Sequence, residues 1–223
     1  MSAATVLNPL LSLIVEPHIA IGLVASFFMV NSLVKLTVFR TDILYEYVRK
    51  MLPISIVMAV IGTYTISFVS SEILLILIFA MSAYFLIKKT YEFFGKEEVK
   101  KSIHNPTLVI ISIISGFMQG TGLGAGGSLR KVYLLSENIT LQQVHGTTSL
   151  ISFVVLVFAF VVRLNTDQLT IDIVMPILYI SPIIIVATLF GKKVLKKFSK
   201  KITDIVGFVT MLLITVILGF EIF

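Results

Sequence analysis

The sequence predicts an all-α protein that crosses a lipid bilayer several times. Its side chains are 57% hydrophobic and only 13% charged, with a mean hydropathy of +1.03. Soluble domains carry about a quarter of charged residues. A bilayer core needs roughly 20 apolar residues in one helix, and apolar stretches of about that length recur at 18–38, 51–69, 72–88, 105–119, 141–162, 171–190 and 202–220. These observations predict a polytopic membrane protein, so the lipid bilayer is one of its partners.

Little of the chain is left for a soluble domain, because the longest polar segment is about 89–104. The absence of cysteine excludes disulfides and thiolate metal sites, and no cofactor is predicted. The N-terminus lacks the basic region of a cleavable signal peptide. The net charge of +6 predicts membrane topology, not nucleic-acid binding, because the basic residues lie in short loops between the apolar stretches.

The basic loops predict which side of the membrane each helix end lies on. Fifteen of the eighteen lysines and arginines fall within 35–50, 88–101 and 192–201. The positive-inside rule puts these loops in the cytoplasm of a multi-pass cell-membrane protein. The turns at 69–72 and 163–170 then lie outside, and Arg163 with them.

The stretch "SGFMQGTGLGAGGSLRK" (115–131) interrupts the simple alternation of helices. It holds six glycines between Gly116 and Gly127. The chain must return to the inner side by about residue 140, so 105–119 and 128–136 must enter and leave by the same face. The second arm is too short to span and is expected to be re-entrant. Irregular backbone at membrane depth persists only where protein or a water-filled cavity satisfies it, so we expect the glycines to line a cavity.

An internal repeat relates the two halves. "LPISIVMAVIG" (52–62) aligns with "SPIIIVATLFG" (181–191), and Ser26 aligns with Ser149. Each repeat contains three full crossings, which makes the second repeat inverted, as in many secondary transporters. The predicted organisation is a first transmembrane repeat (1–88), a cytoplasmic linker (89–104) and a second repeat (105–223). The first repeat is expected to lack its first arm, through a mis-assigned start or a real truncation.

The glycine-rich turn offers the chemistry of an anion site. A helix beginning near Gly127 exposes free N–H groups and a partial positive charge. Ser128 could cap that helix, and the Arg130 guanidinium has the planar fork that suits an oxyanion. The polar start of 141–163 and two amides in apolar spans complete the candidate substrate-binding set: Gln119, Gly122, Gly124, Gly126, Gly127, Ser128, Arg130, Thr147, Thr148, Ser149, Ser26 and Asn31.

Each candidate also has a structural interpretation. Glycines in membrane helices allow close packing, and serine or threonine hydroxyls often bond back to their own helix. The Arg130 side chain could extend to lipid phosphates. Lys35 lies close to the end of its helix, and for this residue an extension to lipid is favoured over substrate contact. For His145, a structural hydrogen bond is favoured over a proton-carrying role.

Other functional classes fit less well. The spacing Gly122-x-Gly124-x-x-Gly127 matches a dinucleotide fingerprint, which requires a preceding strand and an acid about 20 residues on. The next acids are Glu137 and Asp167, so an enzyme is not predicted. An anion channel and a non-transporting membrane subunit remain alternatives, although inverted repeats favour alternating access.

Two stretches resemble a known family. "GFMQGTGLGAGGSLRKVYLL…VHGTTSL" is similar to the second-repeat signature of the sulfite exporter TauE/SafE family, and "NPLLSL…PHIAIGLVASFFMVNSLVKL" is similar to its first repeat. The resemblance implies a secondary transporter that exports small sulfur-containing anions, such as sulfite or organosulfonates. The sequence leaves open the individual substrate, the direction, the coupling ion and the oligomeric state, and a homo-oligomer is compatible with it.

Overall fold

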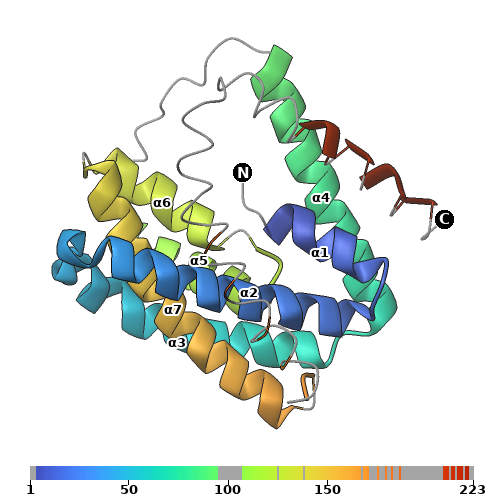
Figure 1. Cartoon of the computed structure of the whole chain (residues 1–223), viewed down its shortest axis with the longest axis horizontal. Coiled ribbons are helices and arrows are strands. Elements are labelled where there is room, and N and C mark those ends of the chain that lie inside the picture. The colour runs from blue at the N-terminus through green and yellow to red at the C-terminus, as the bar shows by residue number, and fades with distance from the viewer. Residues whose placement is uncertain are drawn as a thin grey trace.

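The computed structural model describes residues 4–94, 107–124, 126–137, 139–166 and 168–170, together with scattered positions between 175 and 220. All regular structure in these residues is helical (Figure 1). The elements are α1 (Ala4–Ser12), α2 (Pro17–Val38), the 3₁₀ helix η1 (Arg40–Asp42), α3 (Tyr45–Ser67), α4 (Ser71–Phe94), α5 (Thr107–Gly120), α6 (Gly126–Ser136) and α7 (Leu141–Asn165).

Local sequence explains where several helices begin. Pro17 is the first residue of α2, a position where its fixed φ and missing N–H cost nothing. The start of α7 is fixed by a capping box, in which the Thr140 hydroxyl accepts from the Gln143 N–H. Helix α3 begins at Tyr45, before its apolar run at 51–69, and so includes the polar residues that lead into that run. The spans expected at 171–190 and 202–220 lie largely outside the described residues.

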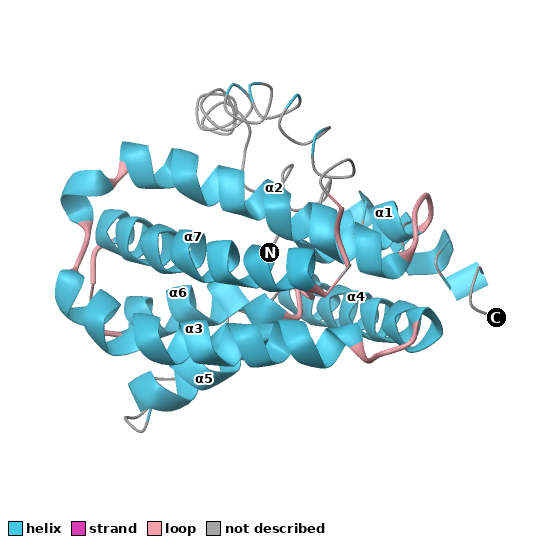
Figure 2. Cartoon of the chain, turned by 90° about the horizontal axis from the view of Figure 1, so that it is seen from below, coloured by secondary structure: helices cyan, strands magenta, loops and turns pink. Residues whose placement is uncertain are grey.

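The three helices of membrane length, α2, α7 and α3, pack with α7 in the middle. Helix α7 contacts both α2 and α3, and α5 packs on α3 (Figure 2). One hydrophobic cluster joins the starts of α3, α5 and α7 to the end of α6, through residues that include Met51, Leu134 and Val144. A second cluster joins the starts of α2 and α4 to the end of α3, through Ile21, Ile66 and Leu74. Helices α2 and α7 are antiparallel. Gly146, near the start of α7, lies against Phe39, which follows α2. At the other end, Leu169, which follows α7, lies against Gly22 near the start of α2.

Small residues let α3 and α5 approach very closely. A Cβ added to Gly116 would lie 2.6 Å from the Ser55 carbonyl oxygen, and one added to Gly120 would lie 2.1 Å from the Ala59 carbonyl oxygen. A Cβ on Gly62 would in turn lie 2.5 Å from the Phe117 carbonyl oxygen. Gly116-x-x-x-Gly120 is thus a small-residue packing motif of the kind that joins membrane helices. Two of the six clustered glycines are explained by packing, as the structural interpretation of the sequence allowed.

The outer surface of these helices is apolar. Large side chains such as Val57, Phe68, Ile76 and Val109 are more than half exposed. Patches of this kind on a water-facing surface would mark an interface, whereas an apolar exterior is expected of helices that face a bilayer. Among the described residues, α2, α3 and α7 are long and apolar enough to cross a membrane, and Ser71–Ile87 is a shorter apolar stretch.

Candidate functional site

A glycine turn, residues 121–124, follows α5 and leads toward α6. Gly122 and Gly124 have φ values of +77° and +98°, in the left-handed region that only glycine adopts at little cost. Helix α6 then starts against α5, since a Cβ on Gly126 would lie 2.2 Å from the Ser115 carbonyl oxygen. The 11 residues of α6 span only about 16 Å at 1.5 Å per residue. This length suits a helix that enters and returns, while its re-entrant placement in the membrane stays a prediction.

Side chains from three other elements satisfy the carbonyl groups freed at this turn. The Asn8 amide of α1 donates to the Gly122 oxygen over 2.8 Å. The Gly120 oxygen accepts from the Thr63 hydroxyl at 2.9 Å and from the Arg163 guanidinium at 2.6 Å. Buried polar backbone needs such partners, and these contacts fix the turn between α1, α3 and α7.

The environment of Arg163 differs from the one that its sequence position predicts. The charge pattern placed it among the residues of an outer turn, whereas the structure buries it completely. Its guanidinium donates to Gly120 and, at 3.1 Å, to the Gln168 side-chain oxygen. Arg163 lies near the end of α7, as expected, but its guanidinium forms hydrogen bonds inside the protein.

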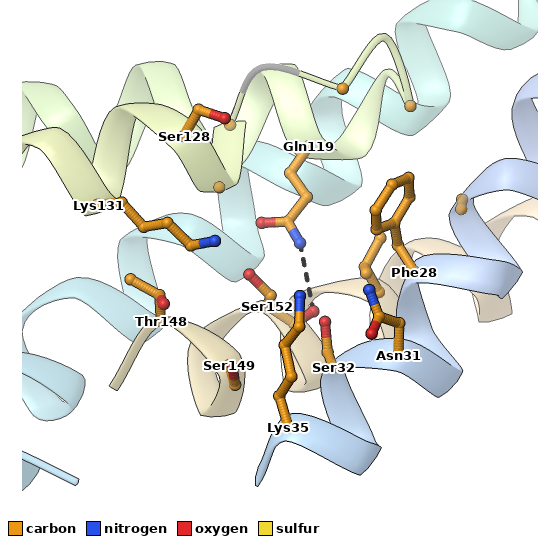
Figure 3. A pocket seen from close by; sticks show the side chains of 16 residues that line it. Phe28, Asn31, Ser32, Lys35, Gln119, Ser128, Lys131, Thr148, Ser149 and Ser152 are labelled. Atoms are coloured by element: carbon orange, nitrogen blue, oxygen red, sulfur yellow. Dashed lines mark hydrogen bonds between the residues drawn. The ribbon is translucent and has the colours of Figure 1, made fainter. Parts of the chain in front are cut away.

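A cavity of about 270 Å³ lies between α2, the glycine turn, α6 and α7 (Figure 3). Drug-sized ligands occupy pockets of roughly 300–1,000 Å³, so this one suits a small ion with a few waters. The residues that line it are Ala25, Phe28, Asn31, Ser32, Lys35, Gln119, Gly122, Gly124, Gly126, Gly127, Ser128, Lys131, Thr148, Ser149, Ser152 and Leu156.

The cavity brings together nine of the twelve sequence-predicted site residues. They are Gln119, Gly122, Gly124, Gly126, Gly127, Ser128, Thr148, Ser149 and Asn31. The first turn of α6 faces the cavity, so free N–H groups are available there. Gln119 is 9% exposed and donates to the Ser152 carbonyl oxygen over 3.3 Å, while its Oε1 has no partner among the described residues. The helix begins at Gly126, which makes Ser128 a first-turn residue and not the expected cap.

Three predicted residues lie outside the lining. The Ser26 hydroxyl donates to Gly22 within its own helix, as membrane serines commonly do. The Thr147 hydroxyl accepts from the Leu44 N–H at 3.0 Å, at the start of α3. Arg130 is fully buried, and none of its three guanidinium nitrogens has a hydrogen-bond partner in the described part of the chain.

Two lysines were missed by the sequence reasoning. Lys35, whose sequence position predicts a side chain that extends to lipid, lines the cavity together with Lys131. The signal for Lys35 was available, because Phe28, Asn31, Ser32 and Lys35 follow the i, i+3, i+4, i+7 spacing of one helix face. Of the four residues on that face, only Asn31 belongs to the candidate substrate-binding set. His145, by contrast, stacks on Phe39 with ring centroids 5.5 Å apart, and the hydrogen bond expected for it stays a prediction.

The described residues hold no group of three His, Cys, Asp or Glu side chains that could bind a metal. What they do provide is an apolar exterior, helices of membrane length and an interior cavity lined by hydroxyls, amides, backbone N–H groups and lysines. These features together define an integral membrane protein with a polar internal site.

Comparison with known families agrees with the resemblance in the sequence. Residues 1–218 match the family described as "Sulfite exporter TauE/SafE", and the chain belongs to that family. Membership implies a membrane transporter of sulfite-like anions, which is consistent with a non-enzymatic role. No curated protein and no solved structure matches the chain.

Proposed function

We propose that the protein is a secondary transporter that exports small sulfur oxyanions, such as sulfite or organosulfonates, across the cell membrane by alternating access. The substrate would bind in the cavity between α2, α6 and α7. One observation carries the proposal. The N-terminus of α6, the Ser149 and Ser152 hydroxyls of α7 and the lysines of α2 and α6 converge on that cavity, and each of these groups favours an anion.

The nature of the cavity also supports a carrier for small ions. Glycines at its edge leave the backbone N–H groups open to a ligand. The turn they form is held by Asn8, Thr63 and Arg163 from three different helices. A binding site supported by several helices can respond to their relative movement, as alternating access requires.

The decisive assay is flux of radiolabelled sulfite and of a sulfonate into proteoliposomes, with and without a pH gradient. We expect saturable flux in the wild type. Gly127→Ala is the informative variant, because the nearest atom to its added methyl group is the Ser152 hydroxyl at 3.8 Å. The methyl group fits the fold and obstructs the approach of an anion to the first turn of α6. Flux should fall by about tenfold, equivalent to a loss of ~1.4 kcal/mol.

Stability serves as the control for this variant. Alanine is favoured over glycine within a helix by roughly 0.5–1 kcal/mol, so the melting temperature of Gly127→Ala should be unchanged or higher. Ser67→Ala, at the exposed end of α3, should leave flux unaffected. Non-saturable flux would favour a channel, and no flux of any oxyanion would favour a non-transporting subunit.

A further inference from the structure

Two lysines from different helices share the cavity. Lys35 lies near the end of α2, and Lys131 follows the first turn of α6. Both residues line the cavity, and in Figure 3 Lys131 extends from the left and Lys35 from below toward the space near Gln119. Both are partly buried, so their ammonium groups are less well hydrated than those of surface lysines.

The described surroundings of these lysines contain no compensating acid. No Asp or Glu is among the residues that line the cavity. The described residues contain one salt bridge, between Lys50 and Glu46 on the exposed face of α3. Lys131 instead experiences Coulomb repulsion from Lys35 and from the buried Arg130. The first turn of α6 adds roughly half a positive charge to the same space.

A site with this charge distinguishes anions by their valence. A singly charged anion neutralises one ammonium group and leaves the second uncompensated in a partly desolvated cavity, which is unfavourable. A doubly charged anion supplies one negative charge for each lysine and can accept charge-assisted hydrogen bonds from both. The repulsion between the lysines in the empty site is therefore relieved more fully by a doubly charged anion.

We infer that the Lys35–Lys131 pair selects doubly charged oxyanions over singly charged ones of the same size and geometry. The inference rests on the proposed function and narrows it, since sulfite in its dianionic form would be preferred to an organosulfonate. A sulfonate that also carries an ammonium group would be disfavoured further, because its cation would face two lysines.

Sulfate and methanesulfonate form a matched pair of probes. Both are tetrahedral at sulfur, and the methyl group of methanesulfonate replaces one oxygen and removes one charge. Binding of radiolabelled sulfate to the purified full chain in detergent is measured first, and unlabelled methanesulfonate is then used as a competitor. We expect sulfate to bind at least about tenfold more tightly, because one charge-assisted hydrogen bond contributes roughly that factor or more.

Lysine variants test whether the pair causes this preference. Lys35→Gln and Lys131→Gln should each weaken sulfate binding by about tenfold or more and methanesulfonate binding by less. The double variant should lose most of the preference for sulfate. Lys50→Gln removes the same charge from the exposed salt bridge and should change neither affinity. Arginine at either position should keep the preference for sulfate, and gel filtration identifies any variant that fails to fold.

The outcomes separate this inference from the proposed function. Equal binding of sulfate and methanesulfonate by the wild type, or an unchanged preference in the double variant, would overturn the inference while oxyanion transport stands. Displacement of sulfate by phosphatidylglycerol but not by soluble anions would assign the lysines to lipid headgroups and would also overturn it. Failure of every oxyanion to bind and to cross proteoliposomes would overturn the proposed function itself.

Discussion

At the scale of single residues, the three buried or partly buried cations on α6 and α7 differ in their partners. Arg163 is paired with the Gly120 carbonyl and the Gln168 side chain. Lys131 reaches the cavity. Arg130 is completely enclosed without a hydrogen-bond partner in the described residues. An isolated buried charge costs several kcal/mol, so a position that keeps one calls for a functional explanation.

We propose that Arg130 contacts the substrate in a second conformation of the transport cycle. Arg130→Met removes the buried charge and keeps an apolar chain of similar length. Such replacements are often neutral or stabilising by about 1–4 kcal/mol, so the melting temperature should not fall. Proteoliposome flux should fall by about tenfold or more if one charged contact to the anion is lost.

Two outcomes for Arg130→Met would refute this role. Full flux would remove Arg130 from the transport path. A lower melting temperature with proportionately lower flux would instead indicate a structural contact. Arg130→Lys is the companion variant, because it keeps the charge but loses the planar fork, and it should recover part of the flux.

At the scale of elements, the glycine-rich stretch divides into two parts with different physical roles. Gly116 and Gly120 belong to the close contact of α5 with α3, where a Cβ would meet backbone atoms. Gly122, Gly124, Gly126 and Gly127 line the cavity. The first part sets the distance between two helices, and the second shapes the turn and the start of α6.

Alanine substitutions at Gly120 and at Gly127 should therefore have different effects on stability. Gly120→Ala places a methyl group 2.1 Å from the Ala59 carbonyl oxygen, so α3 and α5 must separate. Overpacking of this kind costs about 1–3 kcal/mol or more. Thermal unfolding of the detergent-purified protein should occur at a lower temperature than for the wild type, whereas Gly127→Ala should show no decrease. Equal melting temperatures for the two variants would contradict the division.

At the scale of the whole molecule, the helices group their ends on two sides. The residues after α2 pack against the start of α7. On the opposite side, Gln168 after α7 donates to the Thr63 carbonyl near the end of α3. This agrees with the expected order of helices, in which 35–50 and about 140 share one side and 69–72 and 163–170 share the other. The cytoplasmic assignment of the basic loops stays a proposal from their charge.

Single-cysteine labelling tests this orientation, and the absence of native cysteine makes the background clean. Thr41, Ser70 and Asn165 are exposed positions at helix ends. A membrane-impermeant maleimide should label Ser70→Cys and Asn165→Cys in intact cells, and Thr41→Cys only after lysis. Labelling of Thr41→Cys alone would invert the proposed orientation. Labelling of Ser70→Cys and Asn165→Cys from different sides would contradict the grouping of helix ends itself.

The sequence alone was sufficient for the class of protein, most helix positions and nine of the residues that line the cavity. Hydropathy and turn chemistry are local properties, so they can be read along the chain. The sequence was not sufficient to distinguish Lys35 and Lys131, which line the cavity, from Arg130, which is buried outside the lining. It also did not predict that Arg163 donates to the glycine turn. The inverted repeat and the re-entrant placement likewise remain predictions. The direction of a side chain depends on which helices pack around it, and contacts such as that of Arg163 with Gly120 join residues far apart in the chain. Only the tertiary structure brings those residues together and decides which charges face a ligand.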